Sequence, residues 1–467
     1  MKSLAAALAF ALTAAAPPDD FTAARDAPAV MEAVVSPVAD GRFRATLRLR
    51  EDAPVWIFLR SNLPMDAATS WRQDNVRVLT SGVELVRIGY HDALVASDGG
   101  DLPREIVLGV TPFTGLLNAD YQPAIRLGPG SIALFSDHFT LRPAASRGAV
   151  EELGASWTSL PDYDAGHPLV HFRGPGFVAD GRPAAEVTPT RATYVVSGTI
   201  RPGGNDALVT YLDAELPPWL ADELSRDIPA ILSLYERRWG PHEESTPELL
   251  VEWAGANPRL VSLGGSVIGA QIVMRLEGAQ LLSPTGGADR ELRHFIAHEA
   301  AHFWLGELVA YGAAGDAWTS EGGADLAALR AIEAVDPQAG SRREARATRI
   351  AWNQCVAYLQ NGSLVTAPDR GEQQAFYGCG FLLSRVAEAA AMKEGEDFFD
   401  YWNALIERHR DVGRVSQADW IAELARRTGD PAIPALVRRI ATEPLDDPAV
   451  TLASLFERSG LPVPAAQ

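Results

Sequence analysis

The residues of this chain best suited to chemistry are two histidines that flank a glutamate in the run HEAAH, residues 298–302. Four residues make slightly more than one helical turn, so His298 and His302 project from one helix face about 6 Å apart and can bind one ion. Glu299 turns beside them toward whatever the ion holds. A further carboxylate, Glu321, follows His302 by nineteen residues. This ligand set is typical of a catalytic zinc site.

The spacing also predicts how such a site would work. Three protein ligands leave the fourth zinc position open for water, and Glu299 can take a proton from that water as it attacks a carbonyl. Asp325 lies one helical turn after Glu321, so it is either an acceptor for the free ring N–H of a ligating histidine or a solvated carboxylate. His294 extends the histidine series by one turn. Because it is about 12 Å from His302 along the axis, we interpret it as a packing or supporting residue rather than a ligand.

HEAAHFWLGELV followed by AWTSEGGADLAAL resembles the paired zinc motifs of gluzincin metallopeptidases, and most closely those of the aminopeptidase N family. In both, a tryptophan and a glycine follow the second histidine, and a Glu-Gly pair carries the third ligand. The resemblance implies that His298, His302 and Glu321 bind one zinc ion per chain, and that Glu299 is the general base. It further implies that Tyr377, in FYGCG, is the tyrosine of a Tyr-x-x-Gly motif and stabilises the oxyanion.

The resemblance covers residues from about 215 to 440, and the end LFERSGL is also similar to the glycyl aminopeptidase family. The chain departs from the aminopeptidase N pattern where a Gly-x-Met-Glu-Asn stretch supplies a glutamate for the substrate ammonium. The nearest counterpart is GAQIV at 269–273, which places Ile272 at the glutamate position. We therefore predict weak dependence on a free amino terminus, with Glu277 and Glu252 as the alternative anchors.

The segment SVIGAQIVMRLEG predicts a single strand, and its position just before the HEAAH helix is similar to that of the edge strand along which gluzincins pair the substrate backbone. A substrate along residues 268–275 would gain main-chain hydrogen bonds by β-augmentation. The predicted contact residues are Gly269, Ala270, Gln271 and Ile272.

The pattern of apolar residues predicts an α+β fold. Short runs of alternating apolar and polar residues, separated by Gly, Pro, Asp and Asn, predict an antiparallel β-sandwich-like domain at 25–200. The resemblance implies a thermolysin-like catalytic domain at 205–400, and a helical tail follows at 401–467. Helices are predicted at 219–240, 289–310, 318–334, 341–360, 376–394, 397–410, 416–428 and 431–441.

The first residues, MKSLAAALAFALTAAAPP, predict a signal peptide at 1–16, because Lys2 precedes a short apolar stretch that ends in small residues. The alternative is an N-terminal helix that belongs to the fold. With no later segment suited to crossing a membrane, we expect an exported, periplasmic or secreted protein. Cys355 and Cys379 are then either a disulfide or two small buried thiols.

The net charge of −19 disfavours nucleic acid and anionic membranes as partners, and is compatible with peptide or protein substrates. The sequence thus predicts a zinc-dependent metallopeptidase, and leaves open whether it acts within chains or at their ends. Two alternatives remain: a gluzincin fold that has lost catalysis and serves as a binding or scaffold protein, and a zinc hydrolase of a non-peptide substrate.

Overall fold

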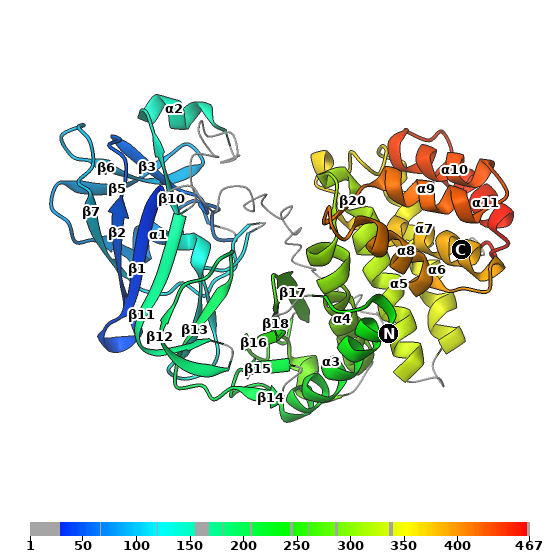
Figure 1. Cartoon of the computed structure of the whole chain (residues 1–467), viewed down its shortest axis with the longest axis horizontal. Helices are drawn as coiled ribbons and strands as arrows, with labels where there is room; N and C mark the ends of the chain where they lie inside the picture. Colours follow the sequence, from blue (N-terminus) through cyan, green and yellow to red (C-terminus); the bar gives the residue numbers. More distant parts are fainter. Residues whose placement is uncertain are drawn as a thin grey trace.

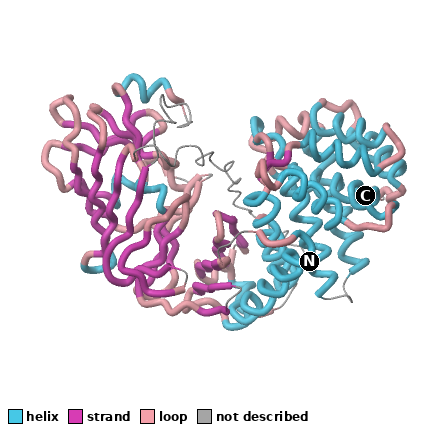
Figure 2. The backbone as a smooth tube through the Cα atoms, in the orientation of Figure 1, coloured by secondary structure: helices cyan, strands magenta, loops and turns pink. Residues whose placement is uncertain are grey.

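The computed structural model describes residues 29–464, apart from gaps at 66, 119, 155–167, 180, 206–207, 243–245, 260, 285–287 and 336–339. The predicted signal peptide at 1–16 lies outside these residues. Strands occupy the N-terminal part and helices the C-terminal part, and a smaller sheet lies between them (Figures 1 and 2). The mixed architecture with an N-terminal β domain is as predicted.

The N-terminal β domain contains two sheets. Within the described residues the larger sheet has the order β4-β7-β2-β1-β11-β13-β9-β8, with β12 beside β11. Its strands are β1 (Met31–Pro37), β2 (Phe43–Leu49), β4 (Val76–Val78), β7 (Glu105–Val110), β8 (Ala124–Arg126), β9 (Ser131–Phe135), β11 (Pro168–Ala179), β12 (Arg182–Val187) and β13 (Tyr194–Gly198). The smaller sheet, in the order β10-β3-β6-β5, contains β3 (Val55–Phe58), β5 (Val83–Ile88), β6 (His91–Ala96) and β10 (Leu141–Ala144). Two short helices, α1 (Trp71–Asn75) and α2 (Arg147–Glu152), flank them.

Alternation along the strands explains why these sheets pack face to face. In β2, Phe43 and Leu47 are buried whereas Arg44 and Arg48 are exposed, as a half-buried strand requires. The buried face meets Trp56 and other apolar residues of the smaller sheet in one core. One part of the prediction is wrong: β1 pairs with β11 in parallel. The chain passes through the smaller sheet between these two strands, which is the long crossover that a parallel pair needs.

A third sheet follows the β domain, in the order β14-β15-β16-β18-β17. Its strands are β14 (Gly203–Asn205), β15 (Leu208–Leu212), β16 (Glu248–Trp253), β17 (Ser262–Ile268) and β18 (Gln271–Glu277). The β domain packs on this sheet through Phe135 and Tyr194, which share a core with Leu250 and Val273. The side-chain oxygen of Gln271 also accepts hydrogen bonds from the β13 region, including the Tyr194 backbone N–H at 2.8 Å.

The prediction of a single edge strand around residues 269–272 is wrong. Gly269, with φ +57°, and Ala270 form a two-residue turn that joins β17 to β18. Gln271 and Ile272 belong to β18, which is hydrogen-bonded to β16 on one side and β17 on the other. An interior strand has no free edge, so these four residues cannot pair with a substrate. Among the described strands, β17 is the edge strand on this side of the sheet, and β14 is the one on the other side.

The helices are α3 (Pro218–Trp239), α4 (Ala288–Ala301), α5 (Trp318–Val335), α6 (Gly340–Leu359), α7 (Gln374–Lys393), α8 (Phe398–His409), α9 (Gln417–Arg427), α10 (Ala432–Thr442) and α11 (Pro448–Ser459). Most lie within a few residues of their predicted ranges, and the predicted boundary at 400–401 falls inside α8. None of the described helices is both long and apolar enough to cross a membrane.

Two helix predictions differ from the structure. The helix expected at 289–310 ends at Ala301 and continues as a π-helical turn, Phe303–Leu308, in which Leu305 and Gly306 leave helical geometry. Helix α11 was not predicted, although it begins with an Asp447 side chain that accepts the Val450 N–H. Such a cap followed by proline is a helix-start signal that the sequence does contain.

Candidate catalytic metal centre

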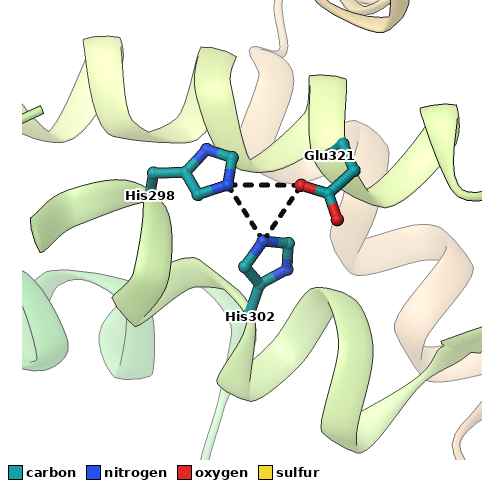
Figure 3. Close-up of side chains that lie close together, drawn as sticks. All are labelled: His298, His302 and Glu321. Atoms are coloured by element: carbon teal, nitrogen blue, oxygen red, sulfur yellow. Dashed lines mark hydrogen bonds and ion pairs between the residues drawn. The ribbon is translucent and has the colours of Figure 1, made fainter. Parts of the chain in front are cut away.

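His298, His302 and Glu321 place three donor atoms around one point (Figure 3). The Nε2 atoms of the two histidines are 3.0 Å apart, and Glu321 Oε2 lies 3.3 Å from Nε2 of His298 and 3.4 Å from Nε2 of His302. Two donors that bind zinc tetrahedrally at about 2.1 Å are separated by about 3.4 Å. Buried Glu321 Oε2 also has no hydrogen-bond partner of ordinary geometry. These residues therefore fit a zinc ion.

The other ring nitrogen of each histidine is held by a partner on the protein. Nδ1 of His298 donates to Asp325 Oδ1 at 2.8 Å, and Nδ1 of His302 donates to the Leu305 carbonyl at 3.1 Å. The helix break after His302 makes that carbonyl available. With Nδ1 protonated in both rings, each Nε2 keeps its lone pair for a metal.

The electrostatics of the site match this arrangement. Burial opposes the charge on His298, but Asp325 and Glu321 outweigh it and raise the pKa of His298 well above its usual value. Burial likewise opposes ionisation of Glu321, yet the two imidazoles hold the pKa of Glu321 well below its usual range. The protein thus stabilises positive charge at this point, which a metal ion can supply in place of protons.

Glu299 lies beside the three donors without being one of them. Its side chain is buried and lines the same cleft. Burial raises the pKa of Glu299, and the neighbouring histidines only partly oppose the shift. A carboxylate whose pKa is raised toward neutrality is a stronger proton acceptor than an ordinary surface glutamate.

Tyr377 approaches the centre from α7. Its ring stacks on His298, with ring centroids 5.6 Å apart and an angle of 22° between the planes. Its enclosed position raises the pKa of Tyr377 well above the usual value, and the charges of Glu321 and Glu299 add to the shift. The phenol therefore stays protonated and can donate a hydrogen bond.

Two glycines explain how α5 and α7 bring Glu321 and Tyr377 so close. A Cβ built on Gly322 would lie 1.9 Å from the backbone of Gly380, and a Cβ on Gly380 would lie 2.2 Å from the Trp318 carbonyl. The helices touch backbone to backbone at the glycines of the Glu-Gly pair and the Tyr-x-x-Gly motif. Helix α7 is also linked to α6 by the disulfide between Cys355 and Cys379, which decides an alternative that the sequence left open.

The site opens into a cleft of about 340 Å³ that reaches from β17 to α6. Asp325 and His294 line it, and His294 Nε2 lies 3.2 Å from Asp325 Oδ1, a contact that agrees with the supporting position we expect for His294. Glu252 and Glu277 do not line it. Glu252 is buried on β16 and accepts a hydrogen bond from Gln122, and Glu277 pairs with Arg275.

Glu307 and Tyr311 are among the cleft-lining residues that sequence reasoning missed. Glu307 accepts the Gly269 N–H at 3.0 Å and lies 3.9 Å from Arg191. Its position directly after the Trp-x-Gly of the zinc motif was a signal that could have identified it.

No protein-family model and no curated protein matches this chain. Several solved structures are similar to it. An aminopeptidase N family protein from Idiomarina loihiensis is similar with a TM-score of 0.61 and 11% sequence identity, over 91% of this chain and 78% of that chain. The chain has the fold of the aminopeptidase N family. An M1 zinc metallopeptidase variant from Deinococcus radiodurans, bound to a Tyr-Ser-Ala substrate, is similar with a TM-score of 0.52 and 15% identity, over 95% of this chain and 97% of that chain.

At this level of identity the likeness is one of fold, and it confirms the gluzincin resemblance at that level. Nearly the whole chain takes part, so the N-terminal β domain belongs to the shared architecture as well as the helices.

Proposed function

We propose that this protein is a zinc-dependent metallopeptidase that hydrolyses peptide bonds with Glu299 as general base. The observation that carries the proposal is the meeting of His298, His302 and Glu321 at zinc-donor distances, with buried Glu299 beside them in one cleft. The peptidase fold supports it.

Each residue of the centre has a role in the proposed reaction. Zinc bound by His298, His302 and Glu321 would supply Lewis acidity, which polarises the substrate carbonyl and lowers the pKa of water at the site. Glu299 takes the proton of the attacking water and returns it to the departing amine. Tyr377 donates to the oxygen on which negative charge develops.

The substrate is positioned by β17 rather than by residues 269–272. Leu263, Gly264, Gly265, Ser266 and Val267 line the cleft at the edge of the sheet. A peptide that adds as a further strand satisfies its own main-chain groups there, which favours an extended substrate of broad side-chain character.

The test is zinc analysis of the purified protein combined with digestion of a mixed peptide library, with cut positions read by mass spectrometry. We expect one zinc per chain and cleaved peptides. Glu299→Gln should retain zinc and lose at least about 100-fold in turnover, because a positioned proton acceptor is removed. Asp289→Asn, which changes an acid of the same helix that does not line the cleft, is the matched control. Zinc without any peptide cleavage would favour a non-peptide substrate, and absence of zinc would favour a scaffold role.

We also propose that the protein is exported. The apolar stretch after Lys2 supports export, and so does the disulfide between Cys355 and Cys379, because such bonds persist in oxidising compartments. Mass determination of the mature protein from culture fractions tests the proposal: an intact N-terminus in the cytoplasm would contradict it.

A further inference from the structure

The cleft extends well past the metal centre between the helices. One face of α6 forms its far wall, where residues three and four apart line it: Arg343, Arg346, Ala347, Ile350, Ala351 and Gln354. From α5, Leu329 and Ile332 face the same space. The cleft therefore continues from the zinc donors into an apolar section, and then to arginines.

The direction of β17 fixes which part of a substrate reaches this end. A Cβ on Gly265 would meet the Phe295 ring of α4. Further along the chain, the N–H of Gly269, in the turn after β17, donates to Glu307, in the π-helical turn after α4. Strand β17 thus runs in the same direction as α4, and its start lies toward Arg290. Antiparallel pairing is the more stable arrangement of strands, and it directs the C-terminal side of a substrate on β17 toward Arg290.

The charge at this end is positive. Among the residues that the structure describes, Arg290, Arg343 and Arg346 line it, and Glu291 is the one acid beside them. Neither Arg290 nor Arg346 forms a hydrogen bond or ion pair with another residue in the described part of the chain. Cationic side chains gathered at one end of a cleft, in a protein of net charge −19, point to an anionic ligand group.

We propose that this arginine end, defined by Arg290, Arg343 and Arg346, binds a substrate carboxylate that lies two to four residues after the scissile bond, with an apolar side chain in between. The inference rests on the proposed peptidase function. Arg290 precedes His298 by eight residues, or about 12 Å along the helix. An extended peptide covers that distance in three to four residues. Because an arginine side chain reaches back toward the metal centre, fewer peptide residues are needed between the scissile bond and the carboxylate.

The carboxylate has two possible sources, the C-terminus of a short peptide and an aspartate or glutamate side chain. Matched peptides separate them: one sequence with a free C-terminus, the same with a C-terminal amide, and amides with glutamate or glutamine at the third position after the cut. For the preferred source we expect kcat/KM about five- to tenfold higher than for its neutral counterpart. Raising the salt from 50 mM to 500 mM should reduce that ratio.

The arginines are tested with Arg290→Gln/Arg346→Gln in the zinc-loaded full chain. The ratio of kcat/KM for the charged peptide to kcat/KM for its neutral counterpart should fall below about threefold, while cleavage of the neutral peptides changes little. Arg349→Gln is the matched control, because Arg349 is exposed on the same helix and does not line the cleft. Its ratio should equal that of the unmodified chain.

Binding to zinc-loaded Glu299→Gln gives a readout that does not require turnover. The same carboxylate preference should appear in the Kd values of the labelled peptides. Equal kcat/KM and equal Kd for charged and neutral peptides of both kinds would overturn the inference while leaving the peptidase function intact. A preference in Kd without any cleavage would instead contradict the peptidase function and retain the arginine site.

Discussion

Asp325 Oδ1 accepts the Nδ1–H of His298 at 2.8 Å. Asp325 lies one helical turn after Glu321 on α5, and its contact holds the plane of the His298 ring. The opposite nitrogen consequently faces Glu321 Oε2 and His302 Nε2. In the structure Asp325 therefore contacts a candidate metal ligand, and we expect it to orient the His298 ring.

The first prediction follows from that contact. Asp325→Asn should lower zinc affinity by about 10- to 100-fold, because an amide oxygen lacks the charge that favours the metal-binding tautomer. Competition against a chromogenic chelator measures it. His294→Ala removes a second partner of the same carboxylate without touching His298 and should cost less. Unchanged affinity in Asp325→Asn would contradict the role of this residue.

Tyr377→Phe should lower kcat much more than it raises KM, with a loss of roughly 2–4 kcal/mol in transition-state stabilisation. The phenol would donate to an oxygen that becomes negative only as the reaction proceeds. Steady-state kinetics on one peptide suffice. Tyr311→Phe, the other phenol in the cleft, is the control and should have a smaller effect. A change mainly in KM would make Tyr377 a packing residue.

Gly322→Ala should destabilise the fold and the site together. The new methyl group would overlap the Gly380 backbone, so α5 and α7 must separate, at a cost of about 1–3 kcal/mol. Chemical denaturation and zinc titration measure the two effects. Gly429→Ala adds a methyl group in open space and should leave both unchanged. A fully stable, zinc-binding Gly322→Ala would show that the close helix contact is not required.

Stability should depend on pH through Glu252. Burial raises its pKa from the usual 4.5 to about 7, and the charge of Arg275 offsets the shift only in part. Between those values the folded chain keeps a proton that the unfolded chain has released, so this contribution to stability falls as pH rises and is fully lost above pH 7. Glu252→Gln should therefore be close to the unmodified chain at pH 5, and more stable by up to about 3 kcal/mol at pH 8. Thermal unfolding of both proteins at each pH tests this, and an equal difference at the two pH values would contradict it.

Cleavage should depend weakly on a free amino terminus. The five residues of β17 that line the cleft carry no carboxylate, and Glu307 already accepts the Gly269 N–H and lies near Arg191. We expect an amino-acetylated peptide to be cut within about tenfold of its free counterpart, since little charge pairing is available to lose. The contrary outcome is that acetylation abolishes cleavage by the unmodified chain, and that Glu307→Gln cuts the acetylated and the free peptide equally. That outcome would identify Glu307 as the anchor of the substrate ammonium.

The sequence by itself determined the parts of the site that depend on local periodicity. His298 and His302 share a helix face because of their spacing, and Glu299 must lie beside them. The alternation in runs such as FRATLRLR likewise fixed the strands of the β domain and their buried faces.

Tertiary structure decided what depends on how separate elements meet. Apolar patterning cannot show that Gly269 turns the chain, so the segment predicted as one strand is in fact the hairpin of β17 and β18. The sheet edge that lines the cleft is therefore at residues 263–267. Pairing of Cys355 with Cys379 required α6 and α7 to pack side by side. The meeting of Glu321 with the two histidines at zinc-donor distances required α5 and α4 to pack at one particular offset. The contact between His298 of α4 and Asp325 of α5 belongs to that pairing, and the close approach of Gly322 to Gly380 holds α5 against α7. Such contacts act between helices and leave no periodic trace in the sequence.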